Sequence, residues 1–206
     1  TNLHITIINS KCCHTQNNKI EIWSNIIDSY IKYNKYIENT KQFLPNTLFV
    51  HIDNFDVFIK KVLLTKKGKI VFFPSSGTGC WEAALQSTLN IGDTVLGASF
   101  GQFSMLWLDM CSRLQFKTIV MDEEWGTGAN LDNYHKHLSE DKNHKIKAVL
   151  VCQNETATGV KSDVAGVRKI LDDLNHPALL MVDGVSSVAS YEFRMDDWGV
   201  YCLVSG

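Results

Sequence analysis

The sequence predicts an α/β fold in which a mostly parallel sheet is flanked by helices. From residue 69 onward, short apolar runs of β-type alternate with stretches whose apolar residues recur at helical spacing. This alternation is typical of stacked βα units. The composition also changes at this point, because all thirteen glycines lie from Gly68 onward.

Six apolar runs are expected to form the strands: 70–73, 94–98, 118–121, 148–152, 178–182 and 200–204. Helical patterns lie between them at about 80–90, 102–114, 131–139 and 163–174. The last is the clearest pattern, because Ser162 can serve as its N-cap and its apolar residues recur on one face.

The composition predicts two regions. Residues 1–66 form an atypical N-terminal segment, rich in Ile, Asn, Lys and Tyr, in which 20–36 could be a helix and 48–52 a strand. Residues 67–206 carry the βα pattern. The first methionine is Met105, so we expect the chain to be incomplete at its front.

Charge and apolar content exclude several classes of partner. The net charge of -2 comes without a basic stripe, and runs such as 177–182 are too short to span a bilayer. We therefore expect neither nucleic acid nor membrane as a partner. The six cysteines show no Cys-x-x-Cys spacing, which favours reduced thiols. Adjacent Cys12 and Cys13, with His14, cannot readily share a tetrahedral site, so no metal is expected.

The segment 74–79, Pro-Ser-Ser-Gly-Thr-Gly, is a candidate phosphate site because it follows a predicted strand and opens a helix. Small residues let backbone N–H groups converge on an anion, and the helix dipole adds to the attraction. A glycine-rich turn with a purely steric role is an equal alternative. A nucleotide site fits poorly, because the Walker lysine is absent and Glu82 stands where the dinucleotide fingerprint needs glycine.

Asp183 directly follows the apolar run 178–182. Ligands of open α/β sheets sit at the carboxyl ends of strands, so this carboxylate is expected to face the ligand crevice. A protonated pyridine nitrogen is one chemically meaningful partner for it. An aspartate that merely caps the next turn is the ordinary alternative.

Two further segments follow other strands. The hydroxyls and amide of 154–159, Asn-Glu-Thr-Ala-Thr-Gly, could orient a ring oxygen or a phosphate. Phe103 could lay its ring on a flat cofactor, although an aromatic side chain at a helix start more often belongs to the core. All four segments follow strands of one predicted sheet, and this convergence favours a single site.

Together these motifs resemble the class V aminotransferases, and the likeness is greatest to the plant-type enzymes that use serine and glyoxylate. It runs nearly unbroken from about Val71 to Gly206 and weakens before it. It rests on residues 73–85, 101–103, 125–126, 154–160, 176–180, 182–187, 193–196 and 198–200.

The resemblance implies a partial large domain of fold-type I, with pyridoxal phosphate as cofactor. Asp183 then matches the acid that pairs with the pyridine nitrogen and is the candidate catalytic residue. The positions that match cofactor contacts are Ser76, Gly77, Thr78, Phe103, Thr156, Asp183 and Val185.

The implied activity moves an amino group from L-serine to glyoxylate, giving hydroxypyruvate and glycine, in a peroxisomal, photorespiratory homodimer. Alanine–glyoxylate transamination and a non-catalytic fragment that only binds cofactor or a partner subunit remain alternatives. Residues 204–206 match the approach to the family's cofactor-binding lysine, which is expected just after Gly206. We therefore expect the chain as given to be inactive, with neither Lys161 nor Lys169 as a substitute.

Overall fold

A seven-stranded sheet forms the centre of the computed structural model, which describes residues 4–9, 55–73 and 75–206. Its strands lie in the order β2-β1-β9-β8-β5-β3-β4. They are β1 (His4–Asn9), β2 (Gly68–Phe73), β3 (Thr94–Ser99), β4 (Lys117–Asp122), β5 (Ile146–Cys152), β8 (Leu179–Asp183) and β9 (Cys202–Ser205).

Most of the sheet is parallel, as predicted. The pairs β4–β3, β3–β5, β5–β8 and β8–β9 all run in the same direction. All six predicted runs form strands. The exception to the parallel order is β1, to which the sequence assigned no element. It is antiparallel to both β2 and β9, so β2 points the same way as β9.

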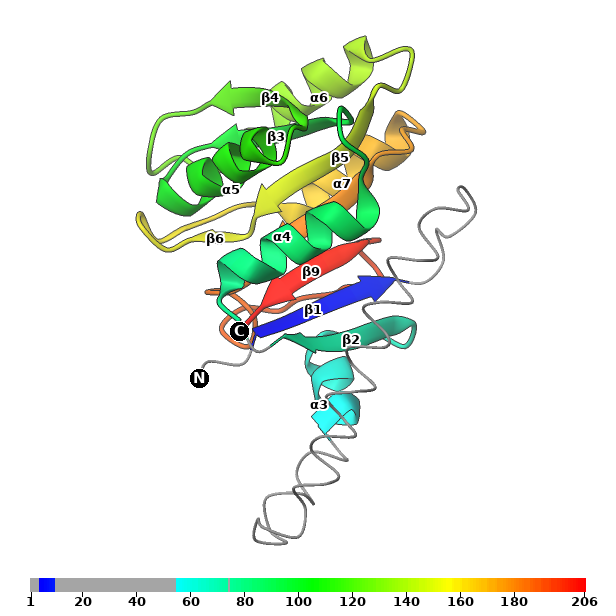
Figure 1. Ribbon diagram of the computed structural model, residues 1–206, viewed down its shortest axis with the longest axis vertical. Helices are drawn as coiled ribbons and strands as arrows, with labels where there is room; N and C mark the ends of the chain where they lie inside the picture. The colour runs from blue at the N-terminus through cyan, green and yellow to red at the C-terminus, as the bar shows by residue number, and fades with distance from the viewer. Residues whose placement is uncertain (1–3, 10–54, 74) are drawn as a thin grey trace, which may run out of the picture.

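The helices form a layer on each side of this sheet (Figure 1). In one layer, α4 (Gly77–Thr88) and α5 (Gln102–Arg113) share a buried apolar cluster with one face of the sheet. On the other face, the cluster includes side chains of α3 (Phe55–Val62), α6 (Leu131–Glu140) and α7 (Val164–Asp173). The four predicted helical patterns correspond to α4, α5, α6 and α7.

The central strands are buried on both faces because successive side chains point to opposite sides of the sheet. In β5, Val149 and Val151 pack on the side of α6 and α7, whereas Ala148 and Leu150 pack on the side of α4 and α5. This double burial explains why the strands read as continuous apolar runs in the sequence.

The start of α7 corrects one sequence prediction. Asp163, rather than Ser162, is the N-cap, and its carboxylate accepts a hydrogen bond from the Gly166 N–H at 2.9 Å. The buried Ser162 hydroxyl instead accepts a hydrogen bond from the Ala129 N–H. A tertiary contact has thus taken the hydroxyl, and the next residue along the chain caps the helix.

Some sequence predictions lie outside the described residues: the possible helix at 20–36, the possible strand at 48–52, and the group Cys12, Cys13 and His14. The other four cysteines, Cys80, Cys111, Cys152 and Cys202, are buried, and none of them forms a disulfide within the described residues. Among the described helices, none is long and apolar enough to cross a membrane.

Candidate functional site

The four segments singled out from the sequence all leave the same edge of the sheet. They follow β2, β3, β5 and β8, which run in one direction. Parallel strands deliver the residues that follow them to a common edge, where ligands of open α/β sheets bind. The convergence expected from the sequence is therefore present in the fold.

The first turn of α4 is open toward this edge. Ser76 is the N-cap, and its hydroxyl accepts a long hydrogen bond of 3.4 Å from the Gly79 N–H. Ser76 and Thr78 are exposed, and the first turn contains no acidic side chain. Because the first N–H groups of a helix lack intrahelical partners, this turn can receive an anion.

Asp183 ends β8 with its side chain turned into the protein, and only 5% of the residue is exposed. Burial raises the pKa of Asp183 to about 6, although hydrogen bonding by the Val185 N–H and then Trp81 opposes the change. The bond from the Val185 N–H is 2.8 Å long. Within the described residues no Lys, Arg or His forms an ion pair with this carboxyl group.

Trp81 is a site residue that the sequence reasoning missed. Its buried indole stacks on Trp107 of α5, with 5.6 Å between the ring centroids. The indole Nε1 lies near enough to Asp183 to lower its pKa, but it has no hydrogen bond of good geometry. The available signal was its position four residues after Gly77, on the helix face that turns toward the sheet.

The loops after β5 and β8 are bonded to each other. The Asn154 side-chain amide donates to the Ser186 hydroxyl at 2.9 Å, and this hydroxyl donates to the Asn154 carbonyl at 3.0 Å. Deeper in the protein, the Ser187 hydroxyl donates to Oε1 of Gln153 at 2.6 Å. These bonds fix the loop that carries Thr156 relative to the loop that carries Asp183.

Phe103 is the second residue of α5 and is 38% exposed. Its backbone N–H donates to the carboxylate of Glu155, which also lies beside Thr156 in the sequence. Glu155 thus ties the start of α5, which carries Phe103, to the loop after β5, which carries Thr156. The sequence reasoning gave Glu155 no role.

The phosphate turn is joined to the rest of the site less directly. Within the described residues, no hydrogen bond links Ser76, Gly77 or Thr78 to the other three segments. The connection runs through α4 itself, whose Trp81 reaches Asp183. The four segments therefore lie at one edge of the sheet, but among the described residues no hydrogen bond joins the α4 turn to the other three.

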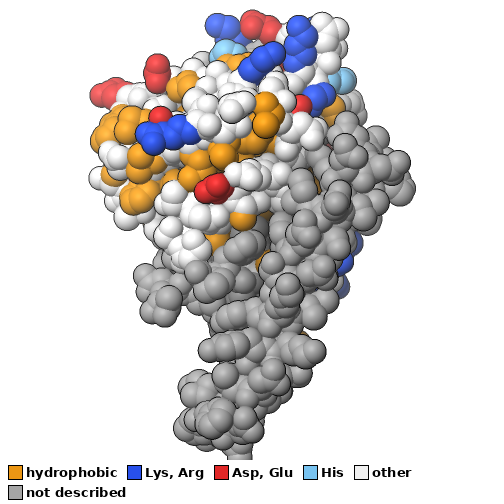
Figure 2. Space-filling view, viewed as in Figure 1, with side chains coloured by type: hydrophobic (Ala, Val, Ile, Leu, Met, Phe, Trp, Pro, Cys, Tyr) orange, Lys and Arg blue, Asp and Glu red, His pale blue; other side chains and the backbone are white. Residues whose placement is uncertain are grey.

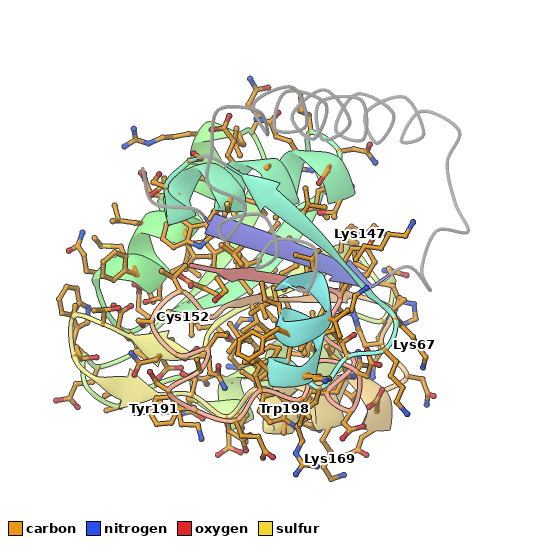
Figure 3. All side chains as sticks on the ribbon, turned by 90° about the horizontal axis from the view of Figure 1, so that it is seen from below. Lys67, Lys147, Cys152, Lys169, Tyr191 and Trp198 are labelled. Atoms are coloured by element: carbon orange, nitrogen blue, oxygen red, sulfur yellow. The ribbon has the colours of Figure 1, made fainter. Side chains whose placement is uncertain are left out.

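Neither lysine considered from the sequence lies in this site as a free amine. Lys169 is mostly exposed and pairs with Asp173 at 2.6 Å, and Figure 3 shows it at the outside of the molecule. The Lys161 ammonium lies 5.0 Å from the centre of the Tyr191 ring, where it makes a cation–π contact. Lys169 faces solvent, as the sequence predicted.

Comparison with known proteins identifies the family. Residues 18–206 match the sequence profile described as aminotransferase class-V. The chain belongs to the class V aminotransferases. It is 62% identical to serine–glyoxylate aminotransferase of Hyphomicrobium methylovorum and 49% identical to that of Arabidopsis thaliana, each over 72% of this chain. It is also 51% identical, over 72% of its length, to L-aspartate–glyoxylate aminotransferase of Paracoccus denitrificans. These alignments cover 36% of the first relative and 37% of the other two.

Solved structures share the fold of this chain. Ureidoglycine–glyoxylate aminotransferase of Bacillus subtilis superposes with a TM-score of 0.69 at 22% identity, covering 78% of this chain and 41% of that one. The α/β architecture with a mostly parallel sheet is thus the one predicted.

The described residues fit the pyridoxal phosphate that the family implies. A buried carboxylate without a cationic partner suits a protonated pyridine nitrogen, and Asp183 is such a group. The open first turn of α4 suits the phosphate. The hydrogen-bonded Asn154–Ser186 contact holds the intervening loops in place. The cofactor's two charged ends thus have matching groups at one sheet edge.

A substitution at Gly77 tests the phosphate seat. We expect Gly77→Val to weaken pyridoxal phosphate binding about tenfold, because a branched side chain in the first turn crowds the anion. Gly77→Ala adds a smaller side chain, so its affinity for pyridoxal phosphate should lie between those of the wild type and Gly77→Val. Titrations with pyridoxal phosphate and with pyridoxal, which lacks the phosphate, give the contrast. If the valine weakens both ligands equally, or neither, Gly77 does not adjoin the phosphate.

Proposed function

We propose that this protein transfers the amino group of L-serine to glyoxylate, giving hydroxypyruvate and glycine. The observation that carries the proposal is the buried carboxyl group of Asp183, which has no cationic partner among the described residues, at the ligand edge of a class V fold. The choice of substrates is supported by the serine–glyoxylate aminotransferases at 62% and 49% identity. Since the chain spans little more than a third of their length, the whole reaction is a proposal for the full-length protein.

Each described group has one task in this reaction. When bound, pyridoxal phosphate supplies an electron sink that stabilises the negative charge left when an amino acid loses its α-proton. The Asp183 carboxylate holds a proton at the pyridine nitrogen and so preserves that sink. The first turn of α4 would hold the phosphate, and the Phe103 ring and the Thr156 hydroxyl would contact the cofactor.

The position of β9 supports a lysine just after Gly206 as the base. Val204 of β9 lies opposite Asp183 of β8 in the parallel register. Residues that continue beyond Gly206 would therefore emerge at the edge where Asp183 sits. A lysine there could bind the cofactor covalently and move the α-proton.

The amino donor is the least constrained part of the proposal. L-Aspartate is a second candidate, because the Paracoccus relative that uses it is 51% identical to this chain. L-Alanine, the alternative expected from the sequence, is a third. Glyoxylate is the acceptor in the names of all three relatives.

Parallel assays of the full-length protein distinguish these donors. With pyridoxal phosphate and glyoxylate in excess, glycine formation is measured with L-serine, L-aspartate or L-alanine as donor. L-Serine should give the highest kcat/KM, with hydroxypyruvate formed in equal amount. A folded, cofactor-loaded protein that forms no glycine from any donor would overturn the proposed function.

Residues 1–206 on their own are expected to show no transamination. The lysines considered as substitutes are engaged elsewhere, Lys169 with Asp173 and Lys161 with Tyr191. The purified polypeptide would be incubated with pyridoxal phosphate, reduced with borohydride and mapped by mass spectrometry. One stoichiometrically labelled lysine together with measurable amino transfer would contradict this expectation.

We also propose a homodimer. Figure 2 shows hydrophobic side chains gathered on the face that carries α4 and α5, and Met105, Leu106 and Val120 are exposed large apolar residues. A contiguous apolar surface of this kind commonly marks a contact with another chain. Analytical ultracentrifugation of the full-length protein should give twice the mass of the chain, and a monomer at all concentrations would exclude the dimer.

A peroxisomal, photorespiratory role is proposed from the resemblance of the sequence to plant-type enzymes alone. A fluorescent fusion of the full-length protein should coincide with a peroxisomal marker in plant cells. Diffuse fluorescence from an intact fusion would exclude that location.

A further inference from the structure

Glu155 is a fully buried carboxylate at the beginning of α5. Its Oε2 accepts hydrogen bonds from the backbone N–H groups of Phe103 at 3.1 Å and Ser104 at 2.9 Å. Its Oε1 accepts from the Ala157 N–H at 3.2 Å and also faces the Phe103 N–H at 3.2 Å. One side chain thus bonds both the start of α5 and the turn that contains Thr156.

The sequence of α5 explains why this carboxylate is needed. The N-cap is Gly101, which has no side chain, and no side-chain hydrogen bond caps the helix from that position. Phe103 and Ser104 are the second and third helical residues, whose N–H groups an N-cap side chain would normally bind. Glu155 binds them from 51 and 52 residues away. Its charge is also favourable at the positive end of the helix dipole.

Gly101 makes room for this contact. A Cβ atom built at Gly101 would overlap the Cγ of Glu155. Its φ of 175° is extended backbone that any residue can adopt. The glycine is therefore required by the close approach of Glu155 rather than by its own conformation.

The other helices that follow α5 are capped locally. Asn130 caps α6 and Asp163 caps α7, each by accepting a hydrogen bond from its own helix. In α5, by contrast, the cap comes from the segment that carries a second predicted cofactor contact. Loss of this cap would separate two parts of one site, whereas loss of the cap of α7 would loosen only α7.

We propose that Glu155 is a positioning residue of the cofactor site, whose carboxylate holds the Phe103 ring and the Thr156 hydroxyl in one fixed arrangement. This inference rests on the proposed function, because it assumes that both residues contact pyridoxal phosphate. Glu155 itself acts through its backbone partners. Its loss should therefore alter how the cofactor is held before it alters any chemical step.

The test uses Glu155→Ala and Glu155→Gln in the full-length protein, with Asp163→Ala as a matched loss of a helix cap. Glu155→Ala should weaken pyridoxal phosphate binding by about tenfold or more. It should also reduce the circular dichroism of the bound cofactor, which reports how asymmetrically its ring is held. Glu155→Gln keeps one acceptor oxygen, so its cofactor affinity and circular dichroism should lie between those of the wild type and Glu155→Ala. Asp163→Ala should lower the melting temperature without changing either cofactor signal.

Hydrogen exchange of the cofactor-free protein gives an independent readout. In Glu155→Ala, the amides of Phe103 and Ser104 should exchange faster together with that of Ala157, because all three lose the same acceptor. Gly101→Ala should produce the same pattern by displacing Glu155. In the double variant Gly101→Ala/Glu155→Ala, the exchange rates should equal those of Glu155→Ala, because the side chain that the added methyl group would displace is already absent.

The outcomes separate this inference from the proposed function. If the wild-type protein binds no pyridoxal phosphate, the proposed function fails, and the exchange data alone decide whether Glu155 couples the two segments. If the wild type binds cofactor and Glu155→Ala matches it in affinity and circular dichroism, while melting lower as Asp163→Ala does, Glu155 is only structural. That result would overturn the inference.

Discussion

Asp183→Asn in the full-length protein is expected to keep the fold and lose most transamination. The amide is nearly the same size and can still accept the hydrogen bond from the Val185 N–H. It cannot hold the pyridine nitrogen protonated, because it carries no negative charge. We expect kcat to fall by about 10²- to 10³-fold, the usual cost of removing one preorganised electrostatic group.

The same chemical change at Asp196 is the matched control. This carboxylate accepts hydrogen bonds from the Thr65 hydroxyl at 2.7 Å and the Lys66 N–H at 2.9 Å, outside the candidate site. Asp196→Asn should cost stability but little turnover. Steady-state kinetics at saturating cofactor give the comparison, and near-normal turnover by Asp183→Asn would remove Asp183 from the mechanism.

Without cofactor, Asp183 should make the protein less stable as the pH rises. Burial raises the pKa of the folded carboxyl group to about 6, against an ordinary value of 3.8. Below pH 3.8 the group is protonated in both the folded and the unfolded state, and its burial carries no charge penalty. As the pH rises toward and past 6, the folded state must bury a charge, which costs about 3 kcal/mol in full.

Urea unfolding of the cofactor-free protein at several pH values measures this penalty against Asp183→Asn, which cannot titrate. The free energy of unfolding of the variant should exceed that of the wild type by an amount that grows between about pH 4 and pH 7. Bound pyridoxal phosphate should reduce the difference, because a cation beside Asp183 lowers its pKa. If the difference in free energy of unfolding does not vary with pH, the charge of Asp183 is already stabilised in the folded protein and its pKa is not raised.

The central strands could be predicted from the sequence because both of their faces are buried. Strand β5 can be predicted from its own residues, because those that face each side of the sheet are apolar. Strand β1 was missed, although its Ile-Thr-Ile-Ile run is rich in β-branched residues. Its place in the sheet could not be predicted, because it pairs with residues far along the chain, with Ile5 opposite Ser205.

The residues of the candidate site likewise divide into those with a local sequence signal and those that act through contacts with distant elements. Asp183 and the segment 74–79 were recognisable because each directly follows a predicted apolar strand, at the edge of the sheet where ligands bind. Glu155 and Trp81 act through contacts with other elements. The partners of Glu155 lie 51 and 52 residues away, and Trp81 reaches Asp183 from another helix. For Glu155, the available hint was a helix whose N-cap, Gly101, has no side chain that could cap it.

The stacked pair of Trp81 and Trp107 gives the protein a built-in optical reporter. Both indoles are almost fully buried, their ring planes are 16° apart, and Trp81 adjoins Asp183. An aromatic cofactor held at Asp183 that absorbs where buried indoles emit would take up their excitation energy at short range. Trp125, more than half exposed, emits at longer wavelength because water surrounds it. The emission of the stacked Trp81–Trp107 pair should therefore fall when the site is occupied.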